Sequence, residues 1–261
     1  MTRPDSPVAS SLLAGIGRGA LDQLASLGRS ARFVGRLFRA HEPQWCLVPA
    51  HFRRVALPTL GPVLAVAAFI GATATLMAYH AFLPLGTQAM IGSFAGLVIL
   101  RELAPLLTGA MIGAKPGTSL TATLATMRGS DQIDALEAMA VDPYAFLLWP
   151  RAVAFVLAAV PLIVIADATG LLSSYATAIT LGISPAAFTS DLLRFVNAGD
   201  VGVGILKGVV FSLMSGGIAS YEGFFASPGP RGVSTAITRA MVRLAIADVL
   251  MNSALSWIFY R

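Results

Sequence analysis

Five ionisable residues lie inside otherwise apolar stretches, where a charge has large energetic consequences. Arg101, Glu102, Asp167, Lys207 and Asp248 each fall within a segment long enough to cross a lipid bilayer. A charged side chain at membrane depth costs roughly 3 kcal/mol or more unless it is paired or wetted. Because adjacent residues of a helix do not face each other, we expect Arg101 and Glu102 each to contact another helix or a wet cavity.

Two kinds of role are open for these residues, and the residue types favour neither. Arg101 and Glu102 could form a buried polar contact that fixes helix packing, or they could take part in transport. For Asp167 we expect a polar contact between helices or an ion pair with Arg101 or Lys207, with proton carriage as a second alternative. Arg101 and Lys207 could also meet the anionic headgroup of a lipid.

A short water-facing segment, residues 131–143, separates two of the apolar stretches. The pattern predicts a helix over 130–142, with Ser130 as its N-cap and Asp131 in the first turn, where the helix dipole favours a negative charge. Asp142 is expected to cap the following helix, with Pro143 at its first position. At 100° per residue the segment has an apolar face of Ile133, Leu136 and Ala140 and an acidic face of Asp131, Asp134 and Glu137.

This helix is too short to span a membrane and can be interpreted in two ways. It could be a solvated connection between two spans, or it could be the contact site for another protein. The second interpretation assigns the contact to ten residues: Asp131, Gln132, Ile133, Asp134, Ala135, Leu136, Glu137, Met139, Asp142 and Pro143.

Several chemistries are not expected of this chain. The single cysteine, Cys46, excludes an internal disulfide, and the three histidines show no metal-ligand spacing. Lys115-Pro116-Gly117 superficially resembles a phosphate loop, but the G-x-x-x-x-G-K-[ST] pattern occurs nowhere in the chain. We therefore expect no catalytic residues, no bound metal or cofactor and no nucleotide hydrolysis by the chain itself.

Composition places the chain in a membrane. Of 261 residues, 56% are hydrophobic and only 12% are charged, whereas soluble domains carry about 25% charged residues. We predict an all-α integral membrane protein with five transmembrane helices, over residues 58–83, 86–114, 146–181, 201–221 and 236–260. A short helix at 185–196 is expected outside the membrane. Any apolar cavity between the spans is expected to be lined by Leu76, Tyr79, Leu97 and Leu100.

The first 54 residues form a basic N-terminal region ahead of a membrane domain over 55–261. Apolar residues recur at helical spacing over 12–38 with arginines between them, which predicts an amphipathic helix lying in the membrane interface. A helix packed on the rest of the protein is the alternative, and nucleic-acid binding explains the same charges less well. No signal peptide is predicted. The arginine distribution places the N-terminus and 128–151 in the cytoplasm and the C-terminus outside.

Several motifs resemble those of the MlaE/YrbE family, the permease subunits of Mce-type ABC lipid transporters of the bacterial inner membrane. They are Glu102-Leu103-Ala104-Pro105, the run Gln132 to Met139, Val141-Asp142-Pro143 and Pro150-Arg151. The resemblance is dense over 101–175, looser towards the C-terminus and almost absent from the first 45 residues. The chain departs from the family at Lys115, Thr123 and Ala140, where the family usually has Arg, Glu and Gly.

The resemblance implies a function and a set of partners. The segment 131–143 would be the coupling helix that docks on a cytoplasmic ATPase dimer, which would hold the ATP and Mg²⁺. A second permease copy, identical or paralogous, and a ring of Mce-domain subunits would complete a phospholipid transporter. An ion-coupled secondary transporter using Glu102, Asp167, Lys207 and Asp248 is the alternative, although no internal repeat supports it. A membrane scaffold without transport activity is a third hypothesis.

Overall fold

The computed structural model describes residues 28, 32–33, 35, 44–87 and 90–260. Within these residues the chain is almost entirely helical and contains no strand, which confirms the all-α prediction. Most of the predicted amphipathic helix over 12–38 lies outside the described residues. Of that stretch, Phe33 is buried and its ring packs against the rings of Tyr144 and Tyr221.

Within the described part of the chain, five helices are long and apolar enough to cross a membrane, as predicted. The first is α2 (Val48–Phe82), flanked by the short 3₁₀ helices η1 (Trp45–Leu47) and η2 (Leu83–Leu85). The third is α7 (Trp149–Thr180), preceded by a π-helical turn, η6 (Tyr144–Leu148). The fourth and fifth are α9 (Ala198–Phe224) and α10 (Pro230–Phe259).

The second span is a continuous stack of five helical pieces. These pieces are α3 (Ile91–Val98), the π-helical η4 (Ile99–Leu103), α4 (Ala104–Ile112), the π-helical η5 (Gly113–Gly117) and α5 (Thr118–Gly129). We expected this helix to end near residue 114. It continues because Lys115-Pro116-Gly117 lies in a π turn, whose wider hydrogen-bonding pattern accommodates the proline without breaking the helix.

The first helix also differs from its predicted bounds. Pro58 and Pro62 were expected near its start, yet both lie inside α2, which begins ten residues earlier, at Val48. The extra turns carry His51, Arg53 and Arg54 and so form a polar start to an otherwise apolar helix.

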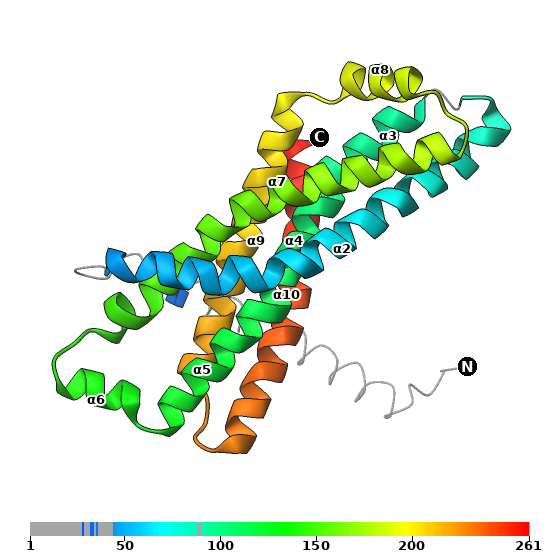
Figure 1. The fold of residues 1–261 in the computed structure, drawn as a ribbon. Helices are drawn as coiled ribbons and strands as arrows, with labels where there is room; N and C mark the ends of the chain where they lie inside the picture. The colour runs from blue at the N-terminus through cyan, green and yellow to red at the C-terminus, as the bar shows by residue number, and fades with distance from the viewer. Residues whose placement is uncertain (1–27, 29–31, 34, 36–43, 88–89, 261) are drawn as a thin grey trace, which may run out of the picture.

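The longest helix pair is α2 against α7, which lie side by side in Figure 1. Small residues allow this approach: a Cβ atom on Gly71 would overlap the carbonyl oxygen of Gly170. Hydroxyl groups add to the contact, with 2.6 Å between the Oγ1 of Thr75 and the Oγ of Ser174. These contacts therefore hold the two helices closely together.

Two short helices lie at opposite ends of the bundle, α6 (Gln132–Ala138) and α8 (Pro185–Phe195) (Figure 1). The predicted helix at 185–196 is thus present, and its N-cap Ser184 accepts a hydrogen bond from the Ala187 amide. The α8 helix packs on α3: Phe188 is buried, and Asp191 accepts a 2.7 Å hydrogen bond from the Ser93 amide.

Candidate functional site

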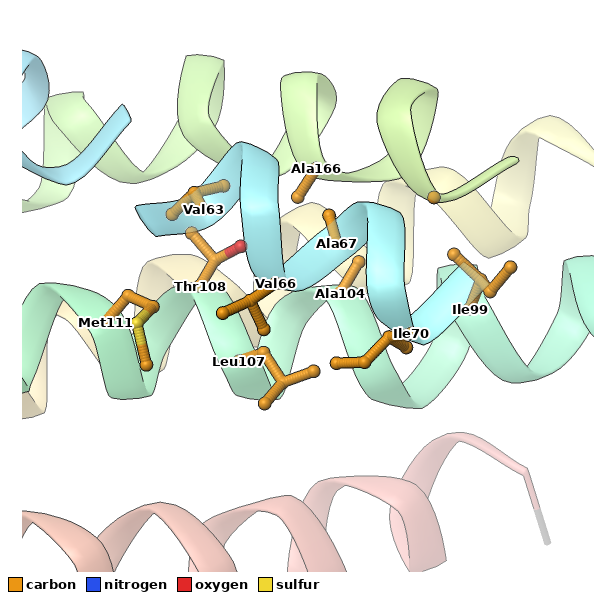
Figure 2. Close-up of a pocket in the computed structure, with 11 residues that line it drawn as sticks. Val63, Val66, Ala67, Ile70, Ile99, Ala104, Leu107, Thr108, Met111 and Ala166 are labelled. Carbon is orange, nitrogen blue, oxygen red and sulfur yellow. The ribbon is translucent and has the colours of Figure 1, made fainter. Parts of the chain in front are cut away.

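An apolar hollow lies between three of the spans. Figure 2 shows Val63 and Ala67 of α2 facing Thr108 of α4, with Ala166 of α7 behind them. The remaining lining residues are Val66, Ile70, Ile99, Ala104, Leu107, Met111 and Gly170. Apart from the Thr108 hydroxyl the lining is apolar, so the hollow offers no partner to a charged solute.

The four residues expected to line a cavity do not line this hollow. Leu76 is 39% exposed on α2, and Tyr79 packs with Ile91 and Phe188 under α8. Leu100 is buried because its backbone lies directly beneath Gly204 of α9. Leu97 is half-buried one turn earlier. The assignment of these four residues to a lipid pathway therefore stays a prediction.

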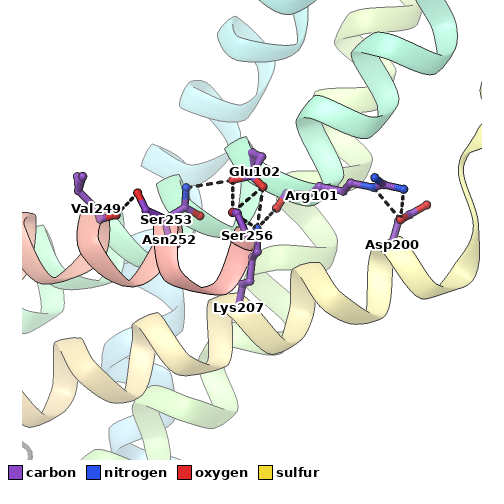
Figure 3. Close-up of polar contacts among 8 residues, drawn as sticks. All are labelled: Arg101, Glu102, Asp200, Lys207, Val249, Asn252, Ser253 and Ser256. Carbon is purple, nitrogen blue, oxygen red and sulfur yellow. Dashed lines mark hydrogen bonds and ion pairs between the residues drawn. The ribbon is translucent and has the colours of Figure 1, made fainter. Parts of the chain in front are cut away.

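A charged network joins the second, fourth and fifth spans (Figure 3). Lys207 of α9 is completely buried and donates 2.8 Å hydrogen bonds to Glu102 Oε1, the Arg101 carbonyl oxygen and Ser256 Oγ. Ser256 and Asn252 of α10 both donate to the Glu102 carboxylate. Glu102 is therefore held by two other helices.

The neighbouring Arg101 points the other way along α9. Its Nε and Nη2 atoms bond to Asp200 Oδ1 at 2.8 and 2.7 Å. Asp200 also forms a capping box with Asn197 at the start of α9, which fixes the carboxylate in position. The Tyr260 ring lies 4.7 Å from the Arg101 guanidinium carbon and 4.9 Å from Lys207 Nζ. Both cations thus have a compensating carboxylate and an aromatic neighbour.

These contacts confirm that Arg101 and Glu102 each find a partner on another helix. The two side chains lie in the π turn η4, where the backbone pattern is locally wider, and such turns often occur at functional sites. The predicted fourth span began at residue 201, so Asp200 lay outside it and was not predicted as a partner. The sequence does contain a pattern that indicates Asp200 as a partner: Asp200 and Lys207 are seven residues apart and so share one face of a helix.

The predicted ion pair between Asp167 and Arg101 or Lys207 is wrong. Both cations bond to other carboxylates, and neither oxygen of the buried Asp167 has a hydrogen-bond partner in the described part of the chain. Asp248 of α10 is also buried, and its Oδ1 atom lacks a partner there. Among the described residues, the ion pairs of the network are therefore Arg101–Asp200 and Glu102–Lys207, and each pair is neutral overall.

The acidic segment begins differently from the prediction. Ser130 was expected to cap α6, but it terminates α5 instead, and its hydroxyl donates to the Thr126 carbonyl at 2.9 Å. Asp131 precedes α6 in the left-handed conformation, with a φ of 56°. The error follows from α5, which continues to Gly129 and leaves only a sharp bend before α6. The predicted cap by Asp142 is confirmed, because its Oδ1 accepts a 2.9 Å bond from the Tyr144 amide, but η6 begins at Tyr144 and not at Pro143.

The two faces of α6 have different environments. Ile133 is fully buried in the cluster that contains Leu124 and Phe224, whereas Asp131, Asp134 and Glu137 are exposed. Asp134 forms a 2.5 Å ion pair with Arg128. Leu136 is half-buried, and Ala140 is exposed because the helix ends at Ala138. The remaining contact candidates, Gln132, Ala135, Met139 and Asp142, are exposed, while Pro143 is buried.

Among the described residues, five spans around a charge-balanced network, with an exposed acidic helix at one end, define a multi-pass membrane protein. A family model described as Permease MlaE matches residues 48–258. The chain belongs to the MlaE permease family.

Curated relatives support this membership. The chain is 31% identical over 144 residues to a probable ABC transporter permease protein of Rickettsia conorii, covering 55% of this chain and 56% of the relative. It is 28% identical over 144 residues to the intermembrane phospholipid transport system permease protein MlaE of Haemophilus influenzae, covering 54% and 55%. The matched region thus spans about half the length of the curated relatives.

Proposed function

We propose that this chain is the permease subunit of an ABC transporter that moves phospholipid or a related lipid between the inner membrane and an Mce-domain protein. Family membership supports the permease role, and the name of the Haemophilus influenzae relative supports the lipid. The observation that carries the proposal is α6. Its acidic face is exposed, while Ile133 anchors it in the core of the membrane domain.

The α6 helix would be the docking point of a cytoplasmic ATPase dimer that binds ATP and Mg²⁺. A displacement of α6 would be transmitted to the spans, because Ile133 lies in one buried cluster with Leu124 of α5 and Phe224 of α9. In this proposal the N-terminus and α6 are cytoplasmic, as the arginine distribution predicts. A symmetric pair of permeases, identical or paralogous, would present two such helices to the two ATPase subunits.

The lipid would move through an apolar path between the spans towards an Mce-domain ring on the outer side. The hollow between α2, α4 and α7 is one apolar surface on this path, and Leu76, Tyr79, Leu97 and Leu100 are proposed as further lining residues. A lipid headgroup would reach Arg101 or Lys207 only by displacing Asp200 or Glu102, because both cations are paired.

Glu137→Lys tests the docking role. We expect this variant to lose co-purification with a co-expressed ABC ATPase and to lose lipid-stimulated ATP hydrolysis, because a cation replaces an exposed carboxylate. Ser190→Lys places the same side chain at an exposed position of α8, at the opposite end of the bundle (Figure 1). This control should leave both co-purification and ATP hydrolysis intact. Full binding and activity of Glu137→Lys would refute the assignment. Uptake driven by a proton gradient without any ATPase would favour a secondary transporter instead.

A further inference from the structure

A second hollow lies where the starts of α2, α5 and α7 meet. Its polar lining consists of His51 and Arg54 from α2, Ser119 and Thr123 from α5, and Arg151 from α7. We call this set the basic hollow. It is separate from the charged network of Arg101 and Lys207, and none of its residues has been assigned a role above.

Within the part of the chain that the structure describes, the charges of the basic hollow are not compensated. Among the described residues no carboxylate lines it, and neither Arg54 nor Arg151 forms an ion pair with any of them. The Nη1 atom of Arg151 is buried and has no hydrogen-bond partner there. Other arginines of the domain behave differently, because Arg101 and Arg128 bond to Asp200 and Asp134. Two guanidinium groups on one hollow without a counter-charge favour the binding of an anion.

The donors in the basic hollow suit a phosphate group. Arginine presents a planar fork of N–H groups that matches phosphate oxygens, and it is preferred where such groups are recognised. The Ser119 hydroxyl forms no hydrogen bond with the described residues and is a further donor. The Thr123 hydroxyl is already committed to the Ser119 carbonyl, at 2.8 Å, so it contributes only an acceptor and shape.

Neighbouring residues place this hollow at the level of lipid headgroups. The rings of Trp45 and Trp149 lie 4.5 Å apart at the starts of α2 and α7, and tryptophan is enriched at membrane–water interfaces. One turn beyond Arg54, Leu57 is 62% exposed, as expected for a side chain that faces acyl chains. Part of the wall is apolar, formed by Val55 and Phe155. A ligand with a phosphate and a hydrocarbon tail would satisfy both surfaces.

We propose that the basic hollow binds the phosphate group of an anionic phospholipid, held between Arg54 and Arg151. A phosphate ester of a lipid and a free phosphate ion would present the same group to the two arginines. The position of the hollow at the level of lipid headgroups favours the lipid. This inference concerns binding by the permease alone, so it holds whether or not the proposed transport function is correct.

The test measures binding by the full chain purified in detergent. Phosphatidylglycerol, phosphatidylcholine and inorganic phosphate are titrated separately, and the midpoint of thermal unfolding is followed, because a ligand that binds the folded state raises it. The first variant is Arg54→Gln, at an exposed position that should not impair folding. Its matched control is Arg53→Gln, which removes the same charge from the adjacent exposed residue outside the hollow.

A second variant changes the hollow without removing an arginine. Thr123→Glu introduces a carboxylate among the lining residues, where it should pair with Arg151 and exclude an anion. Its control is Thr126→Glu, one turn further along α5 and outside the hollow.

We expect phosphatidylglycerol to raise the unfolding midpoint of the wild type more than phosphatidylcholine does. Arg54→Gln and Thr123→Glu should weaken the apparent affinity at least tenfold, while the two controls change it less than threefold. If inorganic phosphate alone reproduces the effect with the same dependence on Arg54, the site is a phosphate-ion site and the lipid assignment is overturned. Equal affinity in Arg54→Gln and Arg53→Gln would overturn the site itself.

Discussion

Replacing Lys207 with methionine should destabilise the membrane domain by removing one partner of a buried ion pair. Lys207 is completely buried and donates three hydrogen bonds of 2.8 Å, to Glu102, Ser256 and the Arg101 carbonyl. Removing one member of such a pair costs about 3–5 kcal/mol. Glu102 keeps Ser256 and Asn252 as donors and its side chain is 33% exposed, so we expect the lower end, about 3 kcal/mol.

A double-mutant cycle separates the pair from the loss of packing. Glu102→Gln removes the charge that Lys207→Met leaves uncompensated, so the double variant should lose less stability than the sum of the two single changes. We expect a coupling energy of about 2 kcal/mol, within the range for residues in direct contact. The free energy of unfolding would be measured by circular dichroism during titration with SDS in mixed micelles.

The exposed Lys115 provides a control, because Lys115→Met removes the same charge from a site with no ion pair in the described part of the chain. Its stability should stay within about 0.5 kcal/mol of the wild type. Single effects that add to within about 0.5 kcal/mol would refute the reasoning, because independent sites behave in that way. The two residues would then not be coupled in the folded protein.

Two further substitutions test the backbone conformation at Ala140 and the close approach of α2 and α7 at Gly71. Ala140 has a φ of 58°, so Ala140→Gly should raise stability by about 1 kcal/mol in the same titration, since an L-residue is strained there; a loss of stability would contradict the observed conformation. Gly71→Val should lower stability by about 2 kcal/mol or more, because the added side chain overlaps the Gly170 carbonyl. Gly61→Val, with open space around it on the same helix, should cost less than half as much.

The five spans could be predicted because each depends on the length and apolar character of one segment. The same is true of the Asp142 cap, which involves only the next two residues. The end of the second span could not be predicted from local rules. Proline and glycine in Lys115-Pro116-Gly117 predict the end of a helix. The helix continues because these residues lie in the π turn at Gly113–Gly117. The misplaced N-cap at Ser130 follows from that single error.

In the candidate sites, too, features set by one segment could be predicted, and features set by the packing of several helices could not. Exposure of Asp134 and Glu137 follows from helical periodicity, and the position of Arg101 and Glu102 within an apolar segment predicted partners on other helices. The identities of those partners depend on how α9 is rotated and how far along the bundle it lies, which no single segment specifies. Asp200 was therefore missed, and Asp167 was assigned an ion pair that the structure does not form.

The second span has a mechanical consequence, because no loop interrupts it between Ile91 and Gly129. At 1.5 Å per residue, Arg101 and Gly129 are separated by about 40 Å of continuous helix. A continuous helix of this length would carry a rotation applied at one end to the other end. Each π turn along it holds one residue more than an α turn. Converting the π turn at Gly113–Gly117 into regular α-helix would therefore rotate the part of the helix beyond it by about 100°.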